Sequence, residues 1–116
     1  MKGTDKNLGG TMRLGSYDCD ISTGSKAFSV YRKKKISERH RHRFEVNNKY
    51  VSKMEKNGLT FSGTNKKLGV VEIIELKDHP WFVGCQFHPE LKSRVDKAHP
   101  LFREFVKASL KNSKKY

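Results

Sequence analysis

The alternation of hydrophobic and polar residues predicts short elements of both kinds along the 116-residue chain. The segment 9–25, GGTMRLGSYDCDISTGS, is punctuated by glycines and predicts a short strand or hairpin. Residues 25–35, SKAFSVYRKKK, predict a short helix with Ser25 as its N-cap. The block 36–48, ISERHRHRFEVNN, predicts an extended segment.

The second half of the chain continues this mixture of helices and strands. Asn47 or Asn48 is expected to cap a helix over about 48–57, with Val51 and Met54 buried. Further along, the pattern predicts strands over 70–76 (VVEIIEL) and 79–87 (HPWFVGCQF), and an amphipathic helix over 99–111 with Pro100 in its first turn.

The predicted strand 70–76 is expected to have one wetter face, because Glu72 and Glu75 interrupt its apolar run. The order of elements indicates a mixed α/β chain of short strands and two or three helices. Several strands have no obvious partner sequence to close a sheet, so the fold looks incomplete if the chain has to fold alone.

Length and composition allow one small domain. No stretch approaches the roughly 20 apolar residues of a membrane span, and no signal-peptide pattern is visible, so no membrane partner is expected. Two cysteines, Cys19 and Cys85, stand far apart in the sequence, which favours a reduced, cytoplasmic compartment over a disulfide.

The formal charge of +13 suggests an anionic partner such as nucleic acid, a membrane surface or a phosphorylated substrate. In an extended segment Arg39, Arg41 and Arg43 line one face, where guanidinium forks suit phosphate or carboxylate. The alternative is a solvated basic edge strand. Nucleic-acid binding is not favoured, because exposed aromatic residues do not interleave with the basic ones and no helix carries a basic stripe.

The stretch CQFHPELKS, residues 85–93, places His88 and Glu90 on either side of a proline. Proline stiffens the link, and in an extended segment residues i and i+2 share a face. The carboxylate could then orient the imidazole, as in the base-and-orienter half of a nucleophilic triad.

A nucleophile to complete such a triad is missing from the sequence. Cys85 points away from His88 by strand parity and is expected to be a small core residue. Cys19 lacks the setting of an activated thiol, and no G-x-C-x-G elbow occurs. A metal site is not expected either, since His40 and His42 have no third ligand at a recognisable spacing.

Five segments in this order and spacing resemble the C-terminal end of the CTP synthase family. They are GGTMRLG, ISERHRHRFEVNN, VEIIEL, DHPWFVGCQFHPELKSR and HPLFREFVKASL. The resemblance runs from about Gly9 to Leu110. The FHPE motif alone is typical of all class I (triad-type) glutamine amidotransferases, and ERHRHRFEVNN narrows the resemblance to CTP synthase.

The resemblance implies that residues 1–116 form the C-terminal portion of a glutaminase domain with a flavodoxin-like α/β fold. His88 and Glu90 match the family's catalytic histidine and glutamate, and Arg43 matches the arginine that contacts bound glutamine. In the family, a separate synthase domain uses ATP and Mg²⁺ to convert UTP to CTP, and the enzyme is a homo-tetramer. No cofactor is expected in this chain itself.

The same resemblance places the nucleophilic cysteine and the synthase domain N-terminal to GGTMRLG, so both are expected to be absent here. The chain would then be an inactive fragment on its own, and the absent strands would explain why several predicted strands lack partners. The alternative is a small basic binding protein for RNA or another polyanion, with family resemblance by ancestry only.

Overall fold

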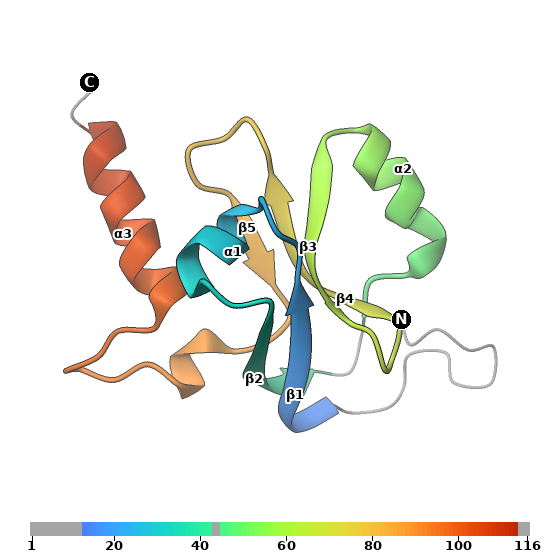
Figure 1. Cartoon of the computed structure of the whole chain (residues 1–116), viewed down its shortest axis with the longest axis horizontal. Coiled ribbons are helices and arrows are strands. Elements are labelled where there is room, and N and C mark those ends of the chain that lie inside the picture. The colour runs from blue at the N-terminus through green and yellow to red at the C-terminus, as the bar shows by residue number, and fades with distance from the viewer. Residues whose placement is uncertain (1–12, 43–44, 114–116) are drawn as a thin grey trace.

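The computed structural model describes residues 13–42 and 45–113, and in these ranges one curled sheet organises the chain (Figure 1). Its strand order is β2-β1-β3-β4-β5, with every neighbouring pair antiparallel. The strands are β1 (Arg13–Ile21), β2 (Lys35–His42), β3 (Leu59–Asn65), β4 (Val70–Leu76) and β5 (Val83–Cys85). Each described strand therefore has a partner, and the expectation that several would lack one was wrong.

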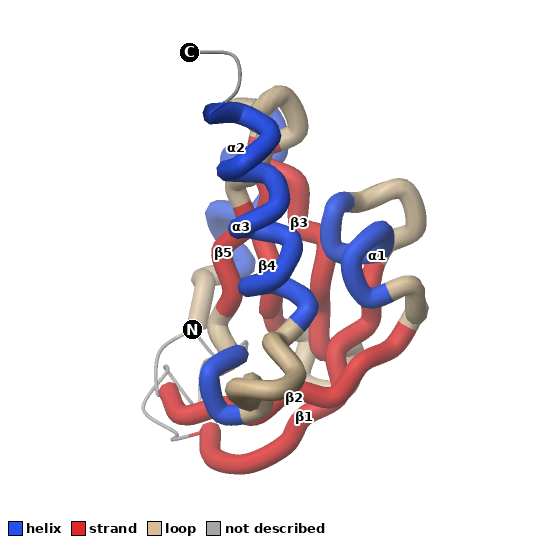
Figure 2. The backbone as a smooth tube through the Cα atoms, turned by 90° about the vertical axis from the view of Figure 1, so that its left-hand side faces the viewer, coloured by secondary structure: helices blue, strands red, loops and turns tan. Residues whose placement is uncertain are grey.

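Helices flank the sheet on different sides and at both ends (Figures 1 and 2). They are α1 (Lys26–Tyr31), α2 (Val51–Lys56) with the 3₁₀ turn η1 (Asn48–Tyr50) before it, the 3₁₀ turn η2 (Pro89–Leu91), and α3 (Pro100–Ser113). Helix α2 packs on β3, whereas α1 contacts α3 at the opposite end of the sheet. None of the helices in the described ranges has both the length and the apolar character needed to span a bilayer.

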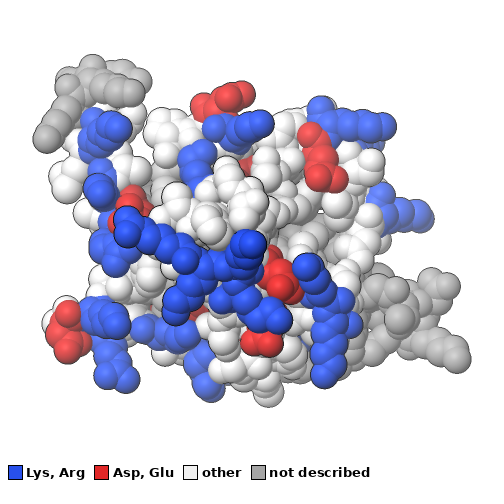
Figure 3. Space-filling view, viewed as in Figure 1, with Lys and Arg blue, Asp and Glu red and all other residues white. Residues whose placement is uncertain are grey.

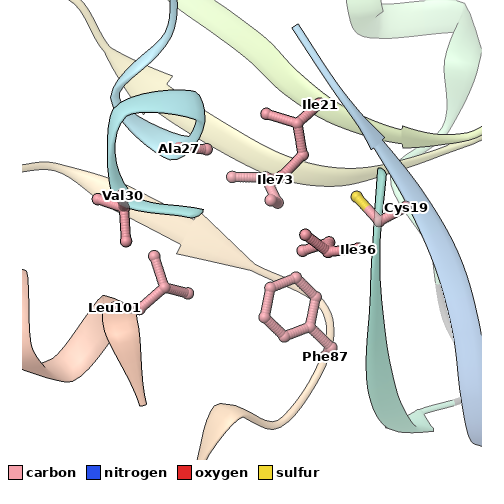
Figure 4. Close-up of a cluster of buried hydrophobic side chains, with 8 residues drawn as sticks. All are labelled: Cys19, Ile21, Ala27, Val30, Ile36, Ile73, Phe87 and Leu101. Carbon is pink, nitrogen blue, oxygen red and sulfur yellow. The ribbon is translucent and has the colours of Figure 1, made fainter. Parts of the chain in front are cut away.

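The hydrophobic core lies between the sheet, α1 and the first turn of α3. Figure 4 shows Val30 of α1 beside Leu101 of α3, with Phe87 close to the strands. The buried apolar cluster consists of Cys19, Ile21, Ala27, Val30, Ile36, Ile73, Phe87 and Leu101. Because these residues come from distant parts of the sequence, the core holds α1, the sheet and the His88 segment in one body.

Strand β4 differs from its prediction, because both of its faces are buried. Glu75 is 3% exposed, and its carboxylate accepts the backbone N–H groups of Lys26 (2.9 Å) and Ala27 (2.8 Å) at the start of α1. Ser25 adds the predicted cap by accepting the N–H of Phe28 at 3.0 Å. Glu75, which had suggested a solvent-exposed face, is thus a buried residue that caps N–H groups left unpaired at the N-terminus of α1.

Candidate active site

His88 and Glu90 are in contact, with Nδ1 and Oε2 2.7 Å apart. The local backbone differs from the expectation. His88 is extended (φ −110°, ψ 90°), but Pro89 begins η2, so Glu90 lies in a 3₁₀ turn instead of a continued strand. Proline suits this first helical position because its φ is already correct and it has no N–H to leave unpaired. A turn, and not strand parity, brings the two side chains together.

The contact defines what each group can do. A carboxylate accepts hydrogen bonds only, so Nδ1 donates its proton to Glu90. In the neutral ring the lone pair then lies on Nε2, which is the atom that can act as a base. The same hydrogen bond from His88 lowers the pKa of Glu90, because it stabilises the charged carboxylate. The side chains are 38% and 57% exposed, so a substrate can approach the pair.

The segment that carries His88 is fastened to the outer edge of β2. The backbone N–H of His88 donates to the carbonyl of Arg39 at 2.9 Å, and Nε2 lies 3.3 Å from the carbonyl of Arg41. Four residues further on, the Lys92 ammonium donates to the carbonyl of Ser37 at 2.7 Å. The outward carbonyls of Arg39 and Ser37 are therefore occupied, and these two hydrogen bonds place the His88 ring beside the Arg41 carbonyl, which can accept from Nε2 only when that nitrogen carries a proton.

The inner face of β2 is held by a buried glutamate. Glu38 is 1% exposed, and its Oε2 accepts from the Tyr31 hydroxyl at 2.6 Å and from His99 Nε2 at 2.5 Å. The tautomer of His99 follows from its other nitrogen, since Nδ1 accepts the N–H of Leu101 at 3.1 Å. Burial raises the pKa of Tyr31, so its hydroxyl stays a donor. This cluster joins α1, β2 and the start of α3.

A second buried cluster lies next to the first along β2. His40, also 1% exposed, has Nε2 2.8 Å from Glu72 Oε2, and Glu72 accepts from Arg13 at 2.6 Å. The His40 ring packs edge-on against Phe87, the residue before His88, with centroids 5.8 Å apart. Sequence reasoning missed both clusters. The signal that could have found them is strand alternation: Ile36 is apolar and faces the core, so Glu38 and His40, two and four residues later, face the core as well.

The predicted arginine row is confirmed as far as it is described. Arg39 and Arg41 are exposed, while His40 between them is buried. Arg43, the residue matched to glutamine binding, lies outside the described residues. No group of three or more His, Cys, Asp or Glu side chains in the described ranges is arranged to hold a metal ion.

The two cysteines have different settings, and neither is that of an activated thiol. Cys19 is fully buried, and this burial raises the pKa of its thiol to about 12. Cys85 is exposed, so the expectation of a buried core residue was wrong. Its position at the end of the short edge strand β5 leaves it beside Phe102 and Pro89 on a surface groove, and its thiol donates to the Phe87 carbonyl at 3.5 Å.

A scan against family models matches residues 1–108 to the class-I glutamine amidotransferase domain. The chain belongs to this family. The amidotransferase chain is also similar to curated CTP synthases: 64% identical over 104 residues to that of Chlorobium phaeobacteroides, and 62% over 105 residues to that of Bdellovibrio bacteriovorus. Each comparison covers 90% of this chain but only 18% and 20% of the relative, so the chain spans about a fifth of their length.

Among solved structures, the amidotransferase chain resembles the glutaminase domain of Trypanosoma brucei CTPS, determined with bound acivicin. The TM-score is 0.82 at 33% identity, covering 87% of this chain and 40% of that one. The predicted relationship to the glutaminase domain of CTP synthase is therefore confirmed. The comparisons lend no support to the alternative of a small RNA-binding protein.

Proposed function

We propose that this chain supplies the base and the orienting carboxylate of a CTP synthase glutaminase site. The observation that carries the proposal is the 2.7 Å contact between His88 Nδ1 and Glu90 Oε2, in a segment fastened to β2. A histidine held by a carboxylate at one nitrogen presents the other nitrogen for proton transfer, which is the arrangement that amide hydrolysis through a thiol needs.

The proposed chemistry has two halves. His88 Nε2 takes the proton of a nucleophilic thiol as sulfur attacks the glutamine carboxamide, and then gives that proton to the departing ammonia. In the second half His88 takes a proton from water, whose oxygen attacks the thioester, and returns it to the leaving thiolate. Glutamine and water become glutamate and ammonia, while Glu90 holds the ring in one tautomer throughout.

The nucleophile is proposed to come from polypeptide outside these 116 residues. Cys19 is enclosed in the core, and Cys85 directs its thiol to the Phe87 carbonyl. The chain also spans only about a fifth of the CTP synthases it resembles, which leaves ample sequence for a nucleophile elbow.

Arg43 is proposed to bind the α-carboxylate of glutamine. The proposal rests on its match to the family motif and on the exposed positions of Arg39 and Arg41, which precede it by four and two residues in the sequence. In the whole enzyme, ammonia from this site would aminate UTP, with ATP and Mg²⁺ bound by the synthase portion, in a cytoplasmic homo-tetramer. Those steps belong to the synthase portion, and none of them is assigned to residues of this chain.

The test uses the chain within a complete enzyme. His88→Ala is expected to abolish CTP formation from glutamine but to leave CTP formation from added ammonia largely intact, because free ammonia bypasses hydrolysis. Glu90→Ala is expected to act in the same direction less severely, as removal of an orienting carboxylate usually costs less than removal of the base. Equal loss of both activities in His88→Ala would assign the residue a structural role and refute the proposal.

A further inference from the structure

A basic cleft lies between the start of β2 and the loop that joins η2 to α3. Its volume is about 790 Å³. One wall is formed by residues 33–38 and the other by residues 92–100, and the half-buried Tyr31 ring lies between them. The volume falls within the roughly 300–1,000 Å³ range of small-molecule sites.

Both walls of the cleft carry positive charge. Five of its lining residues are basic, namely Lys33, Lys35, Lys92, Arg94 and Lys97, and three are acidic, namely Asp18, Glu38 and Asp96. Figure 3 shows basic side chains gathered across the middle of the face that Figure 1 presents. Of the acidic residues, Glu38 is buried beneath the surface and already accepts hydrogen bonds from Tyr31 and His99.

The basic residues of the cleft are held on ordered backbone and are not neutralised. Arg94 and Lys97 close a tight turn, each donating its N–H to the carbonyl of the other at 3.0 and 3.2 Å. Across the cleft, Lys35 is the first residue of β2. Within residues 13–42 and 45–113, none of the five cations forms an ion pair with a carboxylate. With five basic against three acidic lining residues, the net charge of the cleft is positive, and positive charges on both of its walls focus the potential on the space between them.

We propose that this cleft binds a polyphosphate group, either free or as the phosphate chain of a nucleotide. A single phosphate can engage one wall, whereas a chain of phosphates can contact Lys35 on one side and Arg94 on the other at once. The guanidinium of Arg94 can pair with phosphate oxygens in bidentate fashion, while the lysines act as point charges. The site is separate from the His88–Glu90 pair, so its test does not depend on glutaminase activity.

The experiment titrates the ¹⁵N-labelled 116-residue chain with inorganic tripolyphosphate and, separately, orthophosphate, following backbone amide shifts. Saturable shifts at Lys33, Lys35 and residues 92–97 are expected with tripolyphosphate, at an affinity at least about tenfold above orthophosphate, as expected for an added charge-assisted contact. The double variant K35Q/R94Q should weaken tripolyphosphate binding by about tenfold or more. The double variant K53Q/K107Q removes the same charge from α2 and α3 and should leave binding nearly unchanged.

Further arms distinguish the source of the phosphates and can overturn the proposal. A nucleoside triphosphate that binds more tightly than tripolyphosphate would identify a nucleotide, and equal affinity would identify recognition of the phosphate chain alone. Equal losses of tripolyphosphate affinity in the two double variants, or amide shifts spread over all lysines, would mean that the phosphates bind a general basic surface. Either result would overturn the proposal of a specific site. Tighter binding of a 5′-hydroxyl single-stranded oligonucleotide at the same amides would overturn it in favour of nucleic acid. Should K35Q/R94Q lose its amide dispersion, the single variant R94Q replaces it.

Discussion

At the scale of single residues, Glu90 determines which nitrogen of His88 can act as a base. Its carboxylate accepts a hydrogen bond from Nδ1–H at 2.7 Å, and the lone pair of the neutral ring therefore lies on Nε2. The Arg41 carbonyl, 3.3 Å away, can accept from Nε2 only when the ring is protonated there. The contact survives at an exposed position because η2 fixes the two backbones relative to each other, so little side-chain freedom has to be lost to form it.

The lowered pKa of Glu90 gives a pH-dependent prediction. A carboxyl whose pKa is lowered in the folded state gains its stabilisation above its ordinary pKa of about 4.3 and loses it as the pH falls through the lowered value. The His88–Glu90 contact should thus persist at pH 5 and break only below the ordinary range of a glutamate. ¹³C NMR of the Glu90 carboxyl should show a midpoint below that range, and His88→Ala should raise it. An unchanged midpoint in His88→Ala would contradict the assigned cause.

Arg43→Lys in a complete enzyme is expected to raise the KM for glutamine more than it lowers kcat. Lysine keeps the charge but loses the planar fork, so a bidentate contact to the α-carboxylate becomes a single one. This contact is remote from the reacting carboxamide and contributes equally to the ground and transition states, so its loss appears in KM. A charge-assisted hydrogen bond of about 1.5–3 kcal/mol corresponds to roughly tenfold to a hundredfold in affinity.

The matched control is Arg41→Lys, which changes an exposed arginine of β2 two residues earlier in the sequence. Steady-state kinetics with glutamine as the varied substrate should show a much smaller rise in KM for this variant. A rise as large as that of Arg43→Lys would mean that the row acts as a general basic surface.

Individual site residues could be predicted from the sequence where a motif is local, and not where it is assembled by the fold. His88 and Glu90 are two residues apart, so their contact was foreseen, although through the wrong backbone geometry. Glu38 and His99 are 61 residues apart, and Tyr31 joins them from a third element. No local pattern encodes such a cluster. Cys85 was misplaced because burial at the end of a short edge strand depends on neighbours that the sequence does not reveal.

At the scale of elements, β2 is held from both sides at once. Its core-facing side chains, Glu38 and His40, contact Tyr31 of α1, His99 just before α3 and Glu72 of β4. Its outward carbonyls hold the His88 segment. The sequence predicted β2, β4, α1 and α3 well, because each has a clear periodicity or cap. It predicted their environments less well: Val51 and Met54 of α2 are half-buried and not buried, and Glu72 and Glu75 of β4 are enclosed.

Gly63 supplies a prediction about how β3 and β4 pack. The register of the two strands shifts on either side of Gly63, and a Cβ there would lie 2.6 Å from Ile73 Cγ1 and 2.8 Å from Cys19 Sγ. Both neighbours are fully buried, so neither can move without disturbing the core. Gly63→Ala should lower the free energy of unfolding by about 1–3 kcal/mol, as overpacking does. Urea denaturation of the chain measures this loss.

Gly84→Ala in β5 is the control for Gly63→Ala. Its nearest neighbour would be Ile74 Cγ1 at 3.1 Å, a half-buried side chain with room to give way. Its loss should be clearly smaller. Similar losses in the two variants would show that the close contacts at Gly63 do not control packing at the β3–β4 bulge.

At the scale of the whole molecule, an unusual amount of apolar surface is left uncovered around β5 and α3. Helix α3 has the predicted amphipathic sequence, but only Leu101 is buried on it. The exposed apolar side chains of this region, between 40% and 61% accessible, are Phe82, Phe102, Phe105, Val106 and Leu110. A contiguous apolar face of this kind marks a contact surface. The Trypanosoma brucei glutaminase domain, of which only 40% is matched by this chain, has further polypeptide that could cover it.

The isolated chain should accordingly release no ammonia from glutamine above a His88→Ala control, because a base and its orienter cannot form a thioester without a nucleophile. Adding the remaining part of a CTP synthase glutaminase domain, with its elbow cysteine, should restore ammonia release.

Phe105→Lys should raise the concentration of chain needed for half-maximal activity in this mixture, because it places a charge in the apolar face. Tyr50→Lys is the matched control, an aromatic residue of similar exposure (51% against 52%) on η1, beside α2 at the opposite end of the sheet from α3. Circular dichroism establishes that both variants are folded. Equal effects of the two substitutions would exclude the α3 face as the contact surface, and ammonia release by the chain alone would show that it already contains its nucleophile.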